Sequence, residues 1–292
     1  MHVKPRPDSP KIQVLTNKLR AVFITWAFSS KTIDRNRLQQ GCYAMTCQGC
    51  RDGVALSFDF SMAFQPIIDI HTNSVFAYEA LVRGVQGESA ASVLSQVTED
   101  TRYAFDQKCR VKAIETAVRA GLLDTPARLS INFLPNAVYS PLACIQLTLK
   151  TAAAVNLPTD RLIFEFTENE KMVDPAHVAN IVDTYKRMGF GTALDDFGAG
   201  HAGLNLLASL QPDIVKIDME LVRGIGESLP RRIIVDGIVK MCRALGITVL
   251  AEGVETVGEL HALRDIGINL FQGYLFSKPL FEKLPSPTTQ AA

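Results

Sequence analysis

The chain has 292 residues, a formal net charge of zero, 47% hydrophobic residues and 21% charged residues. That length suffices for one large α/β domain or two medium ones with a substantial core. The neutral balance gives no global indication of a nucleic-acid polymer or an anionic membrane as a partner. No apolar run reaches the roughly 18 residues that a membrane-spanning helix needs, so we expect no membrane span.

The N-terminal head differs in charge from the rest of the chain. Residues 1–40 carry eight Lys or Arg against two Asp, so the remainder is acidic. The apolar run 21–28 is too short and too late in the chain for a typical signal peptide. Cys47 and Cys50 form a CxxC pair, but a structural zinc site needs a second ligand pair, and we find none nearby. We expect a poorly ordered basic extension (1–57), a domain over 58–285 and a tail (286–292) in a reduced, cytoplasmic protein.

From about residue 61, short strand-like runs alternate with amphipathic helical runs. The expected strands are 62–70, 75–81, 128–133, 162–166, 191–195, 214–217, 248–251 and 269–272. The clearest helical patterns span 107–120, 176–188, 231–245 and 257–266. Gly189, Gly246 and Gly267 each stand where a helix should stop, as glycines after a helical C-terminus do.

Eight strands with helices between them predict an α/β protein with a modified (β/α)8 TIM-type barrel, rather than an open doubly wound sheet. The first two strands are joined only by residues 71–74. Because a parallel pair needs a crossover of about a dozen residues or more, we expect the first strand to be antiparallel to the second.

Seven successive strands carry or end in a polar residue where an apolar core would have none. These residues are Glu79, Asn132, Glu165, Asp195 with Asp196, Lys216, Glu252 and Gln272. Taken singly, each has an ordinary interpretation as a solvated strand end or a surface lysine. In a barrel, however, the carboxyl ends of the strands build the active site, so closure should bring all of them onto one rim.

Carboxylates crowded on one rim repel each other unless a cation binds. Carboxylate and amide oxygens are hard ligands that suit divalent cations. The adjacent residues Asp195 and Asp196 can face two neighbouring metal ions, which is the arrangement used for attack on phosphorus. Lys216 would then stabilise charge or position the attacking water.

Eight motifs in the chain resemble those of a known family. They are Gln65-Pro66-Ile67, Glu79-Ala80-Leu81, SINFLP around Asn132, FEFTE, DDFGAG, VKID, AEGVE and QGYLFSKP. In this order they resemble the EAL-domain cyclic-di-GMP phosphodiesterases, over roughly residues 58–285. The tripeptide EAL alone would be a weak signal, whereas eight motifs in the family order are specific.

The resemblance implies that the chain hydrolyses cyclic di-GMP to linear pGpG by two-metal activation of water, with Mg2+ or Mn2+. The implied metal ligands are Glu79, Asn132, Glu165, Asp195 and Asp196. The implied catalytic residues are Lys216, Glu252 and Glu79. The implied substrate contacts are Gln65, Arg83 and Gln272, and the residues implied to support the site from further out are Glu168, Asp218 and Glu255.

One position departs from the family pattern. His201 follows DDFGAG, where the family usually has an aromatic residue, most often Tyr. In the family this loop is linked to dimer contacts and metal affinity. We therefore expect a homodimer, while the change puts regulation through this loop in doubt.

Two other functions are open on the sequence. The same fold can serve as a catalytically inactive cyclic-di-GMP receptor or a protein-interaction module, but such members usually lose a metal ligand or the EAL glutamate, and this chain keeps them. A barrel acting on sugar phosphates is disfavoured, because the acidic rim has few basic groups to bind an anion without metals.

Overall fold

The computed structural model describes residues 56–138, 140–167, 175–200 and 203–286, all within the unit Thr46–Ala292. Most of the predicted basic extension and the tail fall outside these ranges. So do four residues singled out in the sequence: Cys47, Cys50, Glu168 and His201. Within the described ranges, no helix combines the length and the apolar character needed to cross a membrane.

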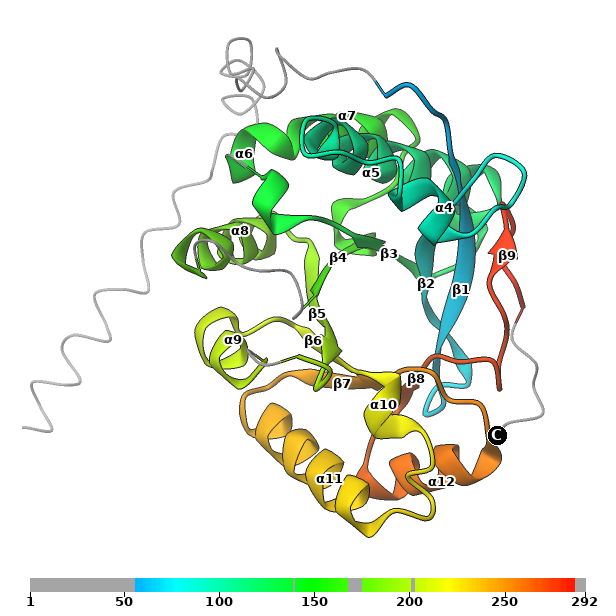
Figure 1. Cartoon of the computed structure of the whole chain (residues 1–292), viewed down its shortest axis with the longest axis vertical. Coiled ribbons are helices and arrows are strands. Elements are labelled where there is room, and N and C mark those ends of the chain that lie inside the picture. Colours follow the sequence, from blue (N-terminus) through cyan, green and yellow to red (C-terminus); the bar gives the residue numbers. More distant parts are fainter. Residues whose placement is uncertain (1–55, 139, 168–174, 201–202, 287–292) are drawn as a thin grey trace, which may run out of the picture. The chain divides into compact units, whose positions relative to one another are not determined.

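Eight strands close into a barrel, and a ninth extends its wall (Figure 1). They are β1 (Ser61–Asp69), β2 (Ser74–Arg83), β3 (Arg128–Asn132), β4 (Leu162–Thr167), β5 (Gly191–Phe197), β6 (Ile214–Ile217), β7 (Thr248–Ala251), β8 (Leu270–Phe271) and β9 (Leu280–Phe281). The hydrogen-bonded order is β2-β3-β4-β5-β6-β7-β8-β1-β9, and a β1–β2 pairing closes the ring. Neighbours from β2 to β8 are parallel, whereas β1 is antiparallel to β2, β8 and β9.

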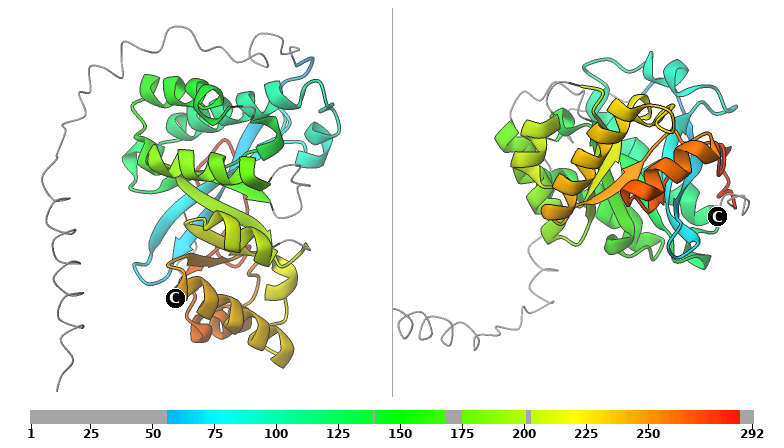
Figure 2. Two further views of the ribbon diagram at one scale, coloured as in Figure 1. Left: turned by 90° about the vertical axis from the view of Figure 1, so that its left-hand side faces the viewer. Right: turned by 90° about the horizontal axis from the view of Figure 1, so that it is seen from below.

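Helices surround the strands in all three views (Figures 1 and 2). The α-helices are α4 (Ala90–Leu94), α5 (Arg102–Arg119), α6 (Pro141–Cys144), α7 (Gln146–Ala154), α8 (Pro175–Arg187), α9 (Gly203–Leu210), α10 (Met219–Val222), α11 (Leu229–Ala244) and α12 (Val257–Ile266). Short 3-10 helices are η1 (Leu122–Asp124), η2 (Pro135–Ala137) and η3 (Thr159–Arg161). The predicted barrel of strands and helices is confirmed.

The start of the barrel is the predicted hairpin. β1 and β2 pair in antiparallel register, with Gln65 opposite Glu79. Asn73 in the connecting turn has a φ of 50°, the left-handed conformation that asparagine tolerates better than most residues. β9 was not expected from the sequence; it pairs with β1 at Ala63 and Phe64.

The predicted helix stops are also present. Gly189, Gly246 and Gly267 have φ values of 87°, 73° and 97°. At the other end of α12, Thr256 and Glu259 form a capping box, in which each side chain bonds the backbone N–H of the other residue. These local signals fix where the helices begin and end, and hence where each strand enters the barrel.

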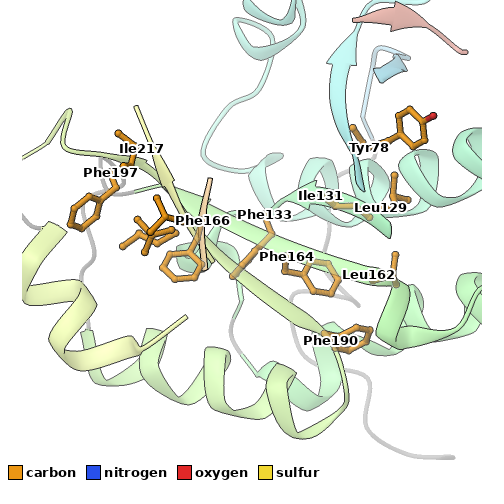
Figure 3. Close-up of a cluster of buried hydrophobic side chains, with 14 of the residues drawn as sticks. Tyr78, Leu129, Ile131, Phe133, Leu162, Phe164, Phe166, Phe190, Phe197 and Ile217 are labelled. Carbon is orange, nitrogen blue, oxygen red and sulfur yellow. The ribbon is translucent and has the colours of Figure 1, made fainter. Parts of the chain in front are cut away.

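Two apolar layers flank the strands. The layer inside the barrel consists of Ile67, Ala77, Ile163, Ala193, Ile214, Leu250 and Leu270. The larger layer lies between strands and helices, where Phe133, Phe164 and Phe190 pack near one another (Figure 3). Because successive strand residues point to opposite faces, Glu165 points inward between the outward-facing Phe164 and Phe166.

A buried ion pair lies within the outer layer. Arg110 on α5 is fully buried, and its Nη2 donates to Asp106 Oδ2 at 2.6 Å. Its Nη1 donates to the hydroxyl of Tyr185 on α8 at 3.1 Å. Asp106 Oδ1 also accepts a hydrogen bond from the backbone N–H of Leu134 at 2.9 Å. We call Asp106, Arg110 and Tyr185 the Arg110 cluster; it ties two helices to the loop after β3.

Candidate functional site

The polar residues of the site form the layer directly above the apolar interior. Along the parallel strands, the interior residues Ala77, Ile163, Ala193, Ile214, Leu250 and Leu270 are followed two positions later by Glu79, Glu165, Asp195, Lys216, Glu252 and Gln272. On β1, which runs the other way, Gln65 instead precedes Ile67 by two positions. The period-two alternation of the strands therefore places these seven side chains in one layer at one end of the barrel.

Lys216 on β6 is the centre of this layer. Its Nζ lies 2.8 Å from Glu252 Oε1, 2.9 Å from Glu165 Oε2 and 3.0 Å from Asp195 Oδ1. A fourth carboxylate oxygen, Glu79 Oε2, is 3.7 Å away. The Lys216 side chain is only 1% exposed. We call the four carboxylates around this ammonium the acid cluster: Glu79, Glu165, Asp195 and Glu252.

Glu79 is fixed by the side-chain amides of Asn132 on β3 and of Gln272 directly after β8. Its Oε1 accepts a hydrogen bond from Asn132 Nδ2 at 2.9 Å, and its Oε2 accepts one from Gln272 Nε2 at 2.7 Å. Gln272 Nε2 also lies 3.3 Å from Gln65 Oε1, and Gln65 Nε2 donates to the carbonyl of Ser277 at 3.1 Å. The structure thus brings together the sequence-predicted residues Gln65, Glu79, Asn132 and Gln272.

Glu165 has a partner that the sequence analysis did not single out. The hydroxyl of Ser130, which is fully buried on β3, donates to Glu165 Oε1 at 2.5 Å. Ser130 lies two positions before Asn132, and it is the registered neighbour of Glu79 on β2. The alternation rule could have placed Ser130 on the inner face, but a lone serine in a strand is too common to be noticed.

Asp195 and Asp196 converge because β5 is irregular at this point. The pairing of β5 with β6 shifts register between Leu194 and Phe197. Asp196 has a φ of 55°, and its backbone N–H donates to Asp195 Oδ1 at 2.9 Å. In a regular strand two adjacent side chains point to opposite faces. The bulge instead allows one oxygen each of Asp195, Asp196 and Glu252 to lie within 4.8 Å of one another.

In a second group, three carboxylate oxygens also lie within 4.8 Å of one another. It comprises Glu79, Glu165 and Asp195, which are all buried. Asp195 belongs to both groups, so the two adjoin each other. All of these donors are carboxylate oxygens, which suit hard divalent cations such as Mg2+, Mn2+ and Ca2+.

Burial makes this site electrostatically unusual. It raises the pKa of Glu165 to about 8 in spite of the opposing pull of Lys216. Burial and the nearby charge of Asp195 raise the pKa of Glu252 well above its ordinary range. For Lys216, burial favours the neutral form, but Asp195, Glu165 and Glu252 outweigh it and hold the pKa well above its usual value. One ammonium therefore compensates the acid cluster only in part.

A cavity of about 260 Å³ opens above this layer. It is lined by Glu79, Glu252, Gln65 and Gln272, and by residues of the loops after β6, β7 and β8. Asp196 lines it as well. Glu79 and Glu252 of the acid cluster thus face a space large enough to admit part of a ligand.

Three lining residues come from outside the strands and were not singled out in the sequence analysis: Met219, Arg223 and Tyr274. No short motif marks Met219 and Arg223, which lie in the short helix α10 and at its end, whereas Tyr274 belongs to the motif QGYLFSKP without having been assigned a role. Arg223 Nη2 forms an ion pair with Glu255 Oε1 at 3.0 Å, which places the sequence-predicted Glu255 at the cavity wall. The ammonium of Lys278 lies over the ring of Tyr274, 5.3 Å from its centroid.

Two further sequence-predicted residues have local roles. Asp218 lines the cavity, but its Oδ1 accepts from the backbone N–H of Glu220 and caps α10. Arg83, at the end of β2, is not among the residues that line the cavity. Its Nη1 donates to the carbonyl oxygen of Val82 at 2.7 Å.

Within the described part of the chain, three buried side-chain polar atoms have no hydrogen-bond partner: Arg110 Nε, Thr148 Oγ1 and Gln272 Oε1. Of the three residues, only Gln272 lines the cavity. Buried polar atoms are nearly always paired, so an unpaired acceptor in this position is a candidate contact for a bound ligand. Together with the carboxylate donor set, it makes the residues at this end of the barrel a fit for a metal-assisted ligand site.

Comparison with protein families gives one match that spans most of the chain. The family described as EAL domain matches residues 54–279. The blue light- and temperature-regulated antirepressor BluF of Escherichia coli K12 is 35% identical over 237 residues, covering 80% of this chain and 58% of BluF. Two relatives from Pseudomonas aeruginosa, 26% and 28% identical, are named cyclic di-GMP phosphodiesterases. This chain spans less than two thirds of the length of each of these relatives.

Solved structures share the same barrel. A standalone versatile EAL protein from Vibrio cholerae O395, in its c-di-GMP-bound form, is 51% identical with a TM-score of 0.78, covering 81% of this chain and 99% of that protein. Klebsiella pneumoniae BlrP1 in a manganese and cyclic-di-GMP complex is 34% identical with a TM-score of 0.73, covering 80% of this chain and 60% of BlrP1.

Proposed function

We propose that this chain, which belongs to the EAL-domain family, hydrolyses cyclic di-GMP to linear pGpG with two divalent cations, Mg2+ or Mn2+. The observation that carries the proposal is the pair of adjoining carboxylate groups that share Asp195 beneath an open cavity. Two similar structures bear on the ligand, since one is titled as c-di-GMP-bound and the other as a complex with manganese and cyclic di-GMP.

The proposed ligands of the first cation are Glu79, Asn132, Glu165 and Asp195. Asp195 and Asp196 would hold the second, with Glu252 and Asp218 nearby. Bound divalent cations supply a nucleophilic water at neutral pH and stabilise charge on phosphate oxygens. Asn132 already directs its Nδ2 toward Glu79, so its amide oxygen remains the ligand atom it can offer.

The chain's own residues would do the remaining work. Lys216 would contact the attacking water and compensate negative charge that grows during the reaction, a contribution that is largest in the transition state. Gln65 and Gln272 would bind the substrate from the cavity floor, where Gln272 Oε1, which has no partner among the described residues, can accept a hydrogen bond. Arg83 would contact a phosphate, for which a guanidinium is well suited.

A second function remains a candidate because BluF is named an antirepressor. A protein-interaction module or receptor on this fold would bind cyclic di-GMP without hydrolysing it. The intact set of carboxylates favours the enzyme, because a receptor has no need of four carboxylates around a single ammonium in a buried layer.

The deciding experiment is incubation of the full chain with cyclic di-GMP and either Mg2+ or Mn2+, followed by chromatographic separation of the nucleotides. We expect pGpG to accumulate, and we expect a chelator to stop the reaction. Asp195→Asn serves as the matched control for contaminating phosphodiesterases. Binding of cyclic di-GMP without formation of pGpG, with either metal, would contradict the proposed hydrolysis and favour the receptor function.

A further inference from the structure

Helix α10 begins directly after β6, and the backbone at that point is bonded to both neighbouring strands. The N–H of Asp218, the cap of α10, donates to the carbonyl of Phe197 at the end of β5, at 3.2 Å. On the other side, the N–H of Glu252, directly after β7, donates to the carbonyl of Ile217 at 3.1 Å. The helix therefore starts between the two segments that supply Asp196 and Glu252.

Leu221, the third residue of α10, packs against the turn that follows Asp196. A Cβ atom at position 198 would lie 2.5 Å from Leu221 Cδ1, so the leucine fills space that only a glycine leaves open there. The φ of Gly198 is 101°, which also favours glycine. Leu221 is partly buried and packs against the hydrophobic core. Its side chain therefore links the core to the turn.

The glycine after Glu252 meets α10 in a different way. A Cβ atom at position 253 would lie 2.5 Å from Met219 Cβ and 3.4 Å from Met219 Cα. These atoms belong to the helix backbone or are attached directly to it, so this contact depends little on the rest of the side chain. The contact at position 198, by contrast, is made by the end of the Leu221 side chain, and a substitution to alanine removes it.

The turn beside Leu221 has an uncommon backbone conformation. Asp196 has a φ of 55°, in the left-handed region that aspartate enters more readily than most residues but less readily than glycine. Because this residue interrupts the regular alternation of β5, its carboxylate can share a group with Asp195 and Glu252. We call these three carboxylates the Asp196 group. Such backbone conformations persist where the surrounding structure holds them, and the contact at Gly198, two positions later, is one such support.

We propose that Leu221 is a positioning residue for the Asp196 group: by packing on Gly198, it holds the turn in the conformation that brings Asp196 beside the other two carboxylates. The inference rests on the proposed function, because it concerns the cation assigned to Asp195 and Asp196. Leu221 has little influence on the other group of carboxylates, whose one member on β5, Asp195, precedes the turn.

The opposite expectation holds if the turn is held by its own hydrogen bonds. The N–H of Asp196 donates to Asp195 Oδ1 at 2.9 Å, and the N–H of Ala199 donates to the carbonyl of Asp196 at 3.1 Å. If these bonds suffice, loss of the Leu221 side chain beyond Cβ leaves the Asp196 group unchanged. A measurement of cation binding without substrate separates the two cases.

The experiment is equilibrium dialysis of the substrate-free full chain against increasing Mn2+ at one fixed pH. We expect wild type to bind two Mn2+ per chain. Leu221→Ala should bind the first Mn2+ as wild type does and the second at least about tenfold more weakly, since groups that orient metal ligands are typically worth about 10- to 100-fold in affinity. A second Mn2+ bound equally well by wild type and Leu221→Ala overturns the proposal, as does a wild type that binds only one.

Two further variants separate positioning from a general loss of stability. Leu221→Met keeps a side chain of similar volume and should bind both Mn2+ as wild type does. Leu149→Ala is the matched control: Leu149 is also a partly buried leucine packed against the core, but it lies on α7, which contributes no residue to either group of carboxylates. Its variant should lose stability and keep both Mn2+. Equal weakening of the second Mn2+ in Leu149→Ala also overturns the proposal.

If Leu221→Ala folds poorly, Leu221→Val takes its place. This variant shortens the side chain by one methylene group, so the second Mn2+ should bind more weakly than in wild type, by a smaller factor than in Leu221→Ala. An unchanged second affinity in Leu221→Val then overturns the proposal.

Failure of this inference is distinguishable from failure of the proposed function. Hydrolysis by wild type, together with equal binding of the second Mn2+ by wild type and Leu221→Ala, rejects only the positioning. Conversely, a wild type that binds two Mn2+ but hydrolyses nothing, with a weakened second Mn2+ in Leu221→Ala, rejects the enzyme and retains the positioning.

Discussion

The acid cluster and the Arg110 cluster are both buried, charged and built across several secondary-structure elements, yet they differ in balance. In the Arg110 cluster one guanidinium meets one carboxylate, and Phe133 and Phe164 pack against the guanidinium with ring centroids 5.5 and 5.4 Å away. In the acid cluster one ammonium meets four carboxylates. The first cluster is closed off by aromatic rings, whereas two carboxylates of the second, Glu79 and Glu252, line a cavity.

The difference shows how a buried charge can be assigned to folding or to chemistry. A balanced pair has its desolvation cost offset within the protein, so removing one partner leaves a buried unpaired charge. In a buried group with more carboxylates than positive charges, the carboxylates repel one another, and a bound cation reduces that repulsion. We therefore expect substitutions in the Arg110 cluster to change stability, and substitutions in the acid cluster to change metal binding and turnover.

The largest expected effect is on turnover. Glu79→Ala and Asp195→Asn should each reduce hydrolysis of cyclic di-GMP below detection, because each removes a proposed cation ligand. The circular dichroism spectrum should stay that of the wild type. Substantial activity in either variant would contradict the ligand assignment for that residue.

The next effect is on folding. Asp106→Ala should lower the free energy of unfolding by about 3–5 kcal/mol, because Arg110 would remain buried without its partner. Urea denaturation measures the change. Asp236→Ala, which breaks the exposed pair with Lys240, is the control and should cost less than about 1 kcal/mol. A similar small loss of unfolding free energy in both variants would mean that burial does not make the Asp106–Arg110 pair more important for stability than the exposed pair.

The third effect is on stability as a function of metal and pH. Mn2+ at about 100 times its dissociation constant should stabilise the fold by roughly 2.7 kcal/mol. Without metal, Glu165 keeps its proton up to about pH 8 when folded but loses it near its ordinary pKa of 4.5 when unfolded. The folded state then holds more protons, so stability falls as pH rises across that window.

Melting temperatures at pH 6 and pH 8, with and without Mn2+, test this sign. The metal-free chain should melt lower at pH 8, and the gain from Mn2+ should be larger there. Glu165→Gln, which cannot ionise, should show a weaker pH dependence between these values. A melting temperature that Mn2+ does not change at either pH would argue against a cation site in the acid cluster.

The smallest expected effect concerns Ser130. Ser130→Ala removes the hydroxyl that orients Glu165, and such supporting groups are typically worth about 10- to 100-fold in metal affinity or activity. We expect the low end, because Lys216 still holds the other oxygen of Glu165. Thr148→Val is the control: Thr148 is also fully buried, on α7, and its hydroxyl has no partner within the described residues. Equal Mn2+ affinity in wild type and Ser130→Ala would contradict a role for Ser130 in metal binding.

Much of the barrel could be predicted because its signals are local. Glycines after helices mark the element ends, and the short link 71–74 forces the hairpin of β1 and β2. The polar layer could be predicted because strand alternation fixes which residues share a face. For Glu165 and Lys216, sequence position alone was enough to place them at the same end of the barrel.

What could not be predicted depends on contacts between distant segments. β9 is two residues long and exists only because β1 offers it a free edge. The hydrogen bond from Ser130 to Glu165 spans 35 positions. Asp218 was interpreted as a site residue, while its role as the cap of α10 depends on a helix of four residues that carries little periodic signal.

Ring closure also has a consequence for the order of events during synthesis. Glu79 leaves the ribosome 193 residues before Gln272, its hydrogen-bond partner. Until β8 is made and pairs with β1, the growing chain has no closed ring, and its early carboxylates have no finished layer to occupy. Lys216 emerges after Glu79, Glu165 and Asp195 but before the closing strand. The nascent chain therefore already contains the Lys216 ammonium as a positive charge for these carboxylates before the closed barrel exists to bind a metal cation.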